Sequence, residues 1–190
     1  MVREALARLR ARGLIETVNG SGTSVRQPDA TFLADALVRH LRFAGVQGEW
    51  VARLYEARET IEVTTAKLAA VRATDADLRQ LADQLEAMQR FRDDSLHWTA
   101  ADLGFHLTVA SASHNLFLST LLTPLVKVIE RGIRESHRSP ESVEAGLQAH
   151  EAVLARLKAR QPVEAGEAML QHLRDSQDRF VAAFGAEAPE

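Results

Sequence analysis

The sequence predicts an all-α protein, an antiparallel bundle of six or seven helices preceded by a short helix and a β-hairpin. Apolar residues make up 46% of the 190 residues, which is enough to bury a substantial core. Aromatic residues make up only 5%, so that core must be built mainly from Leu, Ala and Val. Beyond residue 26 the apolar residues recur with a helical period, and we find no further strand-like segment.

The N-terminal 30 residues predict a helix, a hairpin and a linker, in that order. A helix over 2–12 has Leu6 and Leu9 on one face and stops at Gly13. Strands are expected over 14–18 and 23–26, joined by the turn-forming residues 19–22. Residues 27–30 read as a linker to the helical body.

In the helical body, we expect helices to begin and end where capping residues and prolines occur. Thr74 and Asp94 are candidate N-caps, and Pro140 and Pro162 are placed to start helices. Pro124 is expected to kink the helix that contains it. The predicted helices are 31–44, 49–72, 75–93, 95–112, 115–137, 140–160 and 162–184.

Composition excludes several classes of protein. The chain has no cysteine, which rules out a disulfide scaffold, a thiol nucleophile and any metal site built from Cys. No apolar run approaches the roughly 18 residues of a membrane span. The first residues are charged and lack the apolar stretch of a signal peptide, so we expect a cytoplasmic protein with no membrane partner.

Charge is unevenly distributed along the chain. Residues 1–28 contain five arginines and two glutamates, whereas residues 29–190 contain 18 basic and 24 acidic residues. A basic head on an acidic body indicates an element that binds a polyanion, attached to something else. The alternative is a short amphipathic helix with a solvated basic face.

Histidines and one aspartate fall on apolar helix faces. Asp102 and His106 are four residues apart and therefore point the same way. His150 interrupts an otherwise apolar stripe, and His172 follows Ala165 and Met169 on the inward face of the last helix. One carboxylate and three imidazoles suit a divalent metal ion such as Zn²⁺, Ni²⁺ or Mn²⁺. The alternative is a set of hydrogen-bonded core histidines. The other four are expected at the surface or at caps: His40, His97, His114 and His137.

Two further features bear on the chemistry of this region. Arg58 lies among apolar residues, and it either pairs with Glu62 at i+4 or offers its guanidinium fork to a ligand carboxylate. A metalloenzyme would need a general base near the metal. No Glu lies within a turn of Asp102 and His106, and Glu151 is expected to point away from the site.

Several stretches resemble the GntR family of transcription regulators. Residues 2–6, Leu9, 13–16 and 20–25 resemble the end of the recognition helix and the wing of that family. The body resembles its FadR-type ligand-sensing domain, called FCD. The matching stretches are 54–62, 68–70, 102–106, 113–115, His150 with Leu154, and Met169 with 172–173.

The resemblance implies a partial winged helix-turn-helix DNA-binding domain over 1–28 and an FCD-like effector-binding and dimerisation domain over 29–190. Metal-binding members have one Asp and three His at the corresponding positions, which here are Asp102, His106, His150 and His172. The resemblance further implies effector contacts from Arg58 and Asn115. It implies DNA contacts from Arg3, Gly20, Gly22 and Thr23.

One departure from the family pattern concerns the N-terminus. A complete winged helix-turn-helix has two more helices ahead of the recognition helix, whereas Met1 falls inside the expected recognition helix. A helix end and a hairpin alone cannot bury their apolar faces. We therefore expect the 190-residue chain to bind DNA weakly and without sequence preference.

The leading hypothesis is a metabolite-responsive DNA-binding transcription regulator, not an enzyme. It would be a homodimer that binds an operator, a divalent metal ion and a small organic acid. The alternatives are a stand-alone ligand-binding or dimerisation module without DNA binding, and a helical-bundle metalloenzyme. The hairpin and the basic head favour the regulator over the metalloenzyme.

Overall fold

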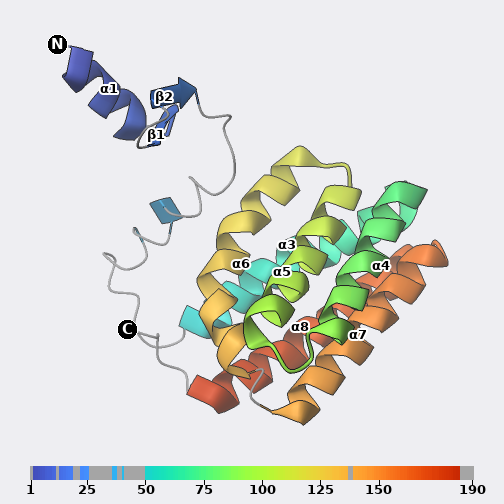
Figure 1. The fold of residues 1–190 in the computed structure, drawn as a ribbon. Helices are drawn as coiled ribbons and strands as arrows, with labels where there is room; N and C mark the ends of the chain where they lie inside the picture. The colour runs from blue at the N-terminus through green and yellow to red at the C-terminus, as the bar shows by residue number, and fades with distance from the viewer. Residues whose placement is uncertain are drawn as a thin grey trace.

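The computed structural model describes residues 2–11, 13–18, 22–25, 36–37, 40, 50–136 and 139–184. Within these ranges it contains seven helices and a two-stranded antiparallel sheet, which confirms the predicted all-α class with a small hairpin (Figure 1). The helix predicted over 31–44 lies almost wholly outside the described residues.

The N-terminal segment has the predicted order of elements. Helix α1 (Val2–Ala11) is followed by Gly13, whose φ of +69° lies in the left-handed region that suits a residue without a Cβ. Strand β1 (Ile15–Val18) pairs with β2 (Gly22–Val25), so that Ile15 lies opposite Val25. The turn between the strands falls outside the described residues.

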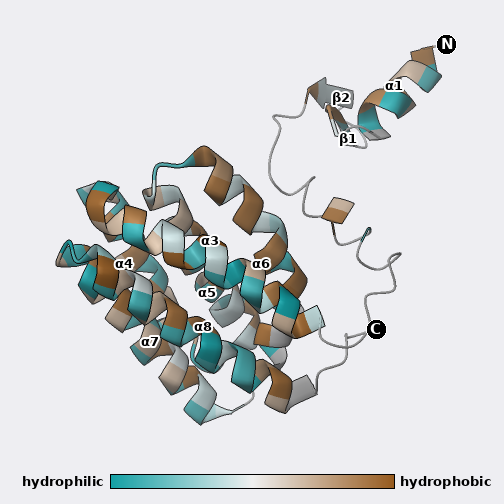
Figure 2. Ribbon diagram, turned by 180° about the vertical axis from the view of Figure 1, so that it is seen from behind, coloured by the Kyte–Doolittle hydropathy of each residue, from teal (hydrophilic) through white to brown (hydrophobic). Residues whose placement is uncertain are grey.

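Six helices form the bundle. They are α3 (Trp50–Arg72), α4 (Asp75–Arg90), α5 (Ser95–Ala112), α6 (Leu116–Ser136), α7 (Pro140–Lys158) and α8 (Pro162–Phe184). Helix α5 packs against α3, α4 and α6, while α8 packs against α3 and α7. Figure 2 shows apolar and polar residues mixed along these helices, and the buried apolar ones form one core. That core includes the buried Tyr55, Phe105, Leu122, Val153 and Leu173.

Helix starts follow the predicted capping chemistry, whereas two helix ends differ. Thr74 and Asp77 form a capping box at α4, and the Asp94 carboxylate accepts hydrogen bonds from backbone N–H groups at the start of α5. Helices α4 and α7 end at Arg90 and Lys158, two to three residues earlier than predicted. The end of α7 is marked by Arg160 at φ +57°, a conformation that sequence reasoning expects from Gly or Asn.

Candidate metal centre

Helix α5 places Asp102 and His106 one turn apart on a buried face. Their side chains are 4% and 2% exposed, so both polar groups must find partners inside the bundle. The burial follows from the local sequence, because α5 carries apolar residues such as Phe105 and Val109 beside them and packs among three other helices.

Helices α7 and α8 bring two more imidazoles to the same place. His150 is fully buried in the predicted apolar stripe of α7, and His172 is 4% exposed on the inward face of α8. The ring centroid of His172 lies 4.3 Å from that of His150 and 5.1 Å from that of His106. Three helices, α5, α7 and α8, therefore converge on one cluster.

The donor atoms of this cluster lie within coordinating reach of one another. One ring nitrogen from each of His106, His150 and His172 lies within 4.8 Å of the others. Asp102 Oδ1 lies 3.4 Å from His150 Nε2, and the Nε2 atoms of His106 and His172 are 3.2 Å apart. The structure thus brings together all four residues that the sequence analysis selected as metal ligands.

Neighbouring acceptors fix the tautomers of two imidazoles. His106 Nδ1 contacts the carboxylate of Glu62, and His150 Nδ1 lies 2.6 Å from the carbonyl oxygen of Gly146. A carbonyl and an ionised carboxylate can only accept, so both Nδ1 atoms carry hydrogen and donate. The Nε2 lone pair of His150 is then free for a cation, while that of His106 faces His172 Nε2 at 3.2 Å.

Electrostatics keep these groups in the forms that such a site requires. Burial alone would raise the pKa of Glu62, but the charge of Arg58, followed by the electrostatic interaction with His106 and the hydrogen bonds from both, lowers it to about 2. Burial lowers the pKa of His150 to about 4, against the opposing charge of Asp102. Burial, followed by the neighbouring imidazoles, lowers the pKa of His172 well below its usual value. Near neutral pH, Glu62 is ionised while His150 and His172 are neutral.

The residues present fit a divalent cation. His150 Nε2 and His172 Nδ1 are buried and have no hydrogen-bond partner within the described part of the chain. Buried polar atoms without partners are costly, and a cation in the cluster would satisfy the free lone pair of His150. Three imidazoles and a carboxylate are ligands that Zn²⁺ and related divalent ions accept.

Arg58 forms the ion pair with Glu62, one of the two alternatives that the sequence leaves open. Its Nε donates to Glu62 Oε1 at 2.7 Å, and both side chains are 1% exposed. Its Nη1 is also buried, yet no acceptor for it occurs among the residues that the structure describes. The guanidinium lies 5.0 Å from the ring centroid of Tyr55. The predicted ion pair is therefore present, and one donor of the fork remains available.

Glu62 is the residue of the site that sequence reasoning missed. The sequence places Glu62 only as the i+4 partner of Arg58, because its approach to His106 depends on how α3 packs against α5. The structure brings Glu62 to His106 from α3, whereas Glu151 is exposed as expected. The one available signal was its spacing from Tyr55 and Arg58, seven and four residues, which puts all three on one face of α3.

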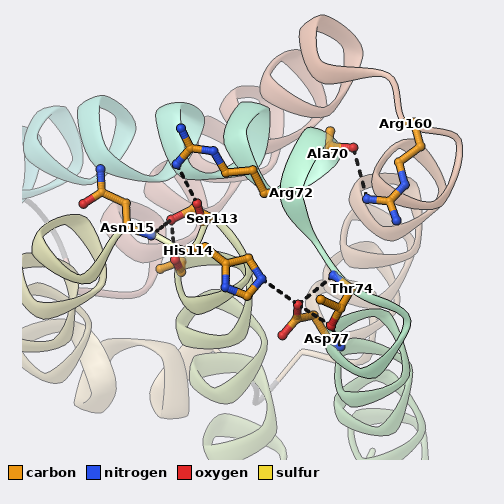
Figure 3. A network of polar contacts seen from close by, with 9 residues as sticks. Ala70, Arg72, Thr74, Asp77, Ser113, His114, Asn115 and Arg160 are labelled. Atoms are coloured by element: carbon orange, nitrogen blue, oxygen red, sulfur yellow. Dashed lines mark hydrogen bonds and ion pairs between the residues drawn. The ribbon is translucent and has the colours of Figure 1, made fainter.

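Asn115 lies away from the histidines, at the N-terminus of α6. Its Oδ1 accepts hydrogen bonds from the backbone N–H groups of Phe117 and Leu118, at 3.2 and 3.3 Å. Figure 3 shows it beside Ser113, whose carbonyl accepts a 2.9 Å hydrogen bond from Arg72. Along α5, seven residues separate Ser113 from His106, or about 10 Å. The structure does not bring Asn115 to the cluster, and its effector contact stays a prediction.

The remaining histidines and the expected DNA contacts lie elsewhere. His97 and His114 are exposed and pair with Asp94 and Asp77, and His40 is exposed; His137 falls outside the described residues. Arg3 is exposed on α1, and Gly22 and Thr23 are exposed on β2; Gly20 is outside the described residues. Thr23 Oγ1 lies 3.1 Å from Thr17 Oγ1 across the hairpin.

Comparisons with known proteins match both the body and most of the whole chain. The family model described as the FCD domain matches residues 53–175. The HTH-type transcriptional regulator LutR of Bacillus subtilis is 32% identical over 188 residues, which cover 96% of this chain and 84% of that protein. A putative L-lactate dehydrogenase operon regulatory protein of Escherichia coli is 30% identical, covering 90% of this chain and 68% of its own length.

A solved structure agrees with these matches. The GntR protein of Streptococcus agalactiae superimposes with a TM-score of 0.68 and 25% identity, covering 93% of this chain and 80% of that one. None of the described helices is long and apolar enough to cross a membrane. The relatives are transcription regulators and not enzymes, so the metalloenzyme alternative is set aside. This chain belongs to the GntR family of transcription regulators, in the FadR-type group that carries an FCD domain.

Proposed function

We propose that this regulator senses a small organic acid through a metal ion held in its helical domain. Asp102, His106, His150 and His172 would hold the ion, which we expect to be Zn²⁺, Ni²⁺ or Mn²⁺. When bound, such an ion offers open coordination positions to an oxygen anion. The observation that carries the proposal is the convergence of three buried imidazoles, two of which have their tautomers set by Glu62 and Gly146.

Arg58 would orient the acid beside the ion. Its buried Nη1 is a charged donor that lacks an acceptor in the described structure, while Nε holds Glu62. A carboxylate that reached Nη1 would satisfy the donor and gain a charge-assisted hydrogen bond. A hydroxy acid, a dicarboxylate or a sugar acid provides such a group.

The N-terminal segment would link acid binding to DNA binding. We propose that residues 1–28 act as part of a winged helix-turn-helix and that residues 29–190 form the effector-binding and dimerisation domain. Arg3 on α1 would contact base edges, and Gly20, Gly22 and Thr23 would bring the wing to the backbone. A homodimer in the cytoplasm would present two such heads to an operator, and acid binding would change their spacing.

The proposal is tested in three measurements on one preparation. Elemental analysis after gentle purification is expected to show about one divalent ion per chain. Thermal melts with hydroxy acids, dicarboxylates and sugar acids are expected to show stabilisation that grows with concentration. Stabilisation only by neutral apolar compounds would contradict the acid-sensing proposal. Sedimentation with and without the acid measures whether the chain is a dimer, as proposed.

A stand-alone module that binds ligand without DNA is the second candidate. The exposed arginine of α1 and the hairpin favour DNA binding. The two candidates differ in a titration of the chain, expressed with whatever residues its gene encodes ahead of Met1, against operator and scrambled duplex at physiological salt. A regulator binds the operator more tightly than the scrambled duplex, whereas a stand-alone module shows no such difference in affinity.

A further inference from the structure

A small cavity lies directly beside the histidine cluster. Its volume is about 20 Å³, enough for roughly one water molecule, so a larger ligand requires the side chains around it to move apart. Its walls include Trp98 and Asp102 of α5, Gly146 of α7, and His172, Ser176 and Arg179 of α8. The cavity is therefore lined by two of the four candidate metal ligands and by Arg179, which lies outside the proposed metal and effector contacts.

Helices α5, α6, α7 and α8 line this cavity. On α5, Trp98 and Asp102 lie one turn apart and His106 follows one turn later, and on α7 Gly146 lies one turn before His150. On α8 the series is His172, Ser176 and Arg179. Seven residues advance a helix by about 10 Å, so Arg179 marks the end of the cavity away from the cluster.

Arg179 is half-buried and lacks a partner that would neutralise it. No hydrogen bond or ion pair joins it to another residue in the described ranges. Its i−4 neighbour Asp175 accepts a 2.7 Å hydrogen bond from Gln171 instead. Arg174 on the same helix differs, because its Nε lies 3.6 Å from Glu59 Oε1. Arg179 thus presents an unpaired cation to the cavity.

The second cation of the region, Arg58, lies near the same stripe of α8. Tyr55, stacked under the Arg58 guanidinium, has its hydroxyl 2.9 Å from Ser176 Oγ. Arg58 therefore lies beside the middle of the α8 series, and Arg179 lies beyond it. One carboxylate can satisfy Arg58 Nη1 beside the cluster, but an acid with a single carboxylate leaves Arg179 without an anion.

We propose that Arg179 is a specificity residue of the effector site and that the effector is a small dicarboxylic acid whose second carboxylate pairs with Arg179. This inference rests on the proposed function, because it assumes that a first carboxylate binds at the cluster. Arginine suits the role, since its planar fork can hold a carboxylate through two parallel hydrogen bonds.

The test compares acids that differ only in the second carboxylate. L-malate and L-2-hydroxybutyrate share one skeleton, with a terminal carboxylate in the first and a methyl group in the second. L-2-hydroxyglutarate and L-2-hydroxyvalerate form the same pair with one more methylene. Each acid is titrated by calorimetry into the zinc-loaded 190-residue chain. We expect the diacid of at least one pair to bind about tenfold more tightly than its partner.

Variants then assign that preference to one side chain. Arg179→Gln is expected to weaken the diacid about tenfold and to leave the monoacid within about twofold. Arg179→Lys, which keeps the charge, is expected to restore part of the preference. Arg174→Gln is the matched control on the same helix and is expected to leave both acids unchanged. Thermal melts without acid verify that each variant is folded.

The outcomes separate this inference from the function it rests on. If monoacids and diacids bind with equal affinity, or if Arg179→Gln weakens both equally, Arg179 does not bind a second carboxylate. In that case only this inference fails. If none of the four acids binds the zinc-loaded chain while a sugar acid does, only this inference fails; if no hydroxy acid, dicarboxylate or sugar acid binds it, the acid-sensing proposal fails as well.

Discussion

Glu62 and His106 contact each other across two helices, although 44 residues separate them in the sequence. The contact fixes which nitrogen of His106 carries hydrogen, and the same carboxylate holds Arg58. Glu62 is thus shared between the candidate metal ligands and the candidate effector contact. Glu62 therefore positions both His106 and Arg58, and the site needs residues of α3 as well as α5.

The first prediction concerns this shared carboxylate. Glu62→Gln keeps the shape of the side chain but removes the charge that fixes the His106 tautomer. We expect zinc affinity to fall about 10- to 100-fold, as is typical when a group behind a metal ligand is changed. Competition with a chromophoric chelator measures it. Glu59→Gln, three residues earlier on α3, is the control, and equal zinc affinity in the two variants would rule out the positioning role.

The second prediction concerns the ligand set. His172→Ala removes one of three imidazoles from the cluster, and we expect the purified chain to lose most of its metal. Elemental analysis of the dialysed protein gives the metal content per chain. His114→Ala removes an exposed imidazole that pairs with Asp77 and should retain the metal. A His172→Ala variant with unchanged affinity would show that the four-residue site is wrong.

The third prediction separates metal binding from acid binding. Complete removal of the Arg58 charge would leave Glu62 buried without its cation, at a cost of about 3–5 kcal/mol. Arg58→Lys avoids this cost, because it keeps the charge but loses the planar fork. We expect the affinity for the stabilising acid to fall at least about tenfold while zinc affinity changes little. Equal losses of zinc and acid would mean that Arg58 acts only through Glu62.

The fourth prediction concerns the end of the bundle away from the cavity. Arg72 donates a 2.9 Å hydrogen bond to the Ser113 carbonyl at the C-terminus of α5 (Figure 3). That carbonyl has no partner within its own helix, so Arg72 ties α3 to α5 there. We expect Arg72→Ala to lower the free energy of unfolding by about 1 kcal/mol in denaturant titrations.

Two controls accompany this measurement. Arg79→Ala on α4 removes an exposed arginine and is expected to change stability by less than about 0.5 kcal/mol. Zinc affinity should be the same in both variants, because Ser113 lies two helical turns beyond His106. Reduced zinc affinity in Arg72→Ala would indicate that the two ends of the bundle are coupled.

Local sequence signals predicted most of the fold. The starts of α4, α5 and α7 follow from Thr74, Asp94 and Pro140, because capping depends on residues within one turn. The ends of α4 and α7 were predicted two to three residues late. Arg160 adopts a left-handed backbone conformation although it is not glycine, and the sequence around it does not predict this.

The candidate site was predictable only in its intrahelical parts. His150 was found because it interrupts an apolar stripe, and Asp102 with His106 because they share a face. The contact of Glu62 with His106 and the approach of Arg179 to the cavity depend on how separate helices pack. Helical spacing places a side chain on a face, but it does not say which residue of another helix lies opposite.

The buried donor set has a practical consequence for anyone who purifies this protein. Three imidazoles and one carboxylate bind most divalent first-row metals, and Ni²⁺ and Cu²⁺ bind such sites more tightly than Mn²⁺ or Fe²⁺. A nickel affinity column would therefore exchange an ion held by the proposed site for its own. The physiological metal has to be identified on untagged protein from cells grown in defined metal supplies, before any chelating resin touches it.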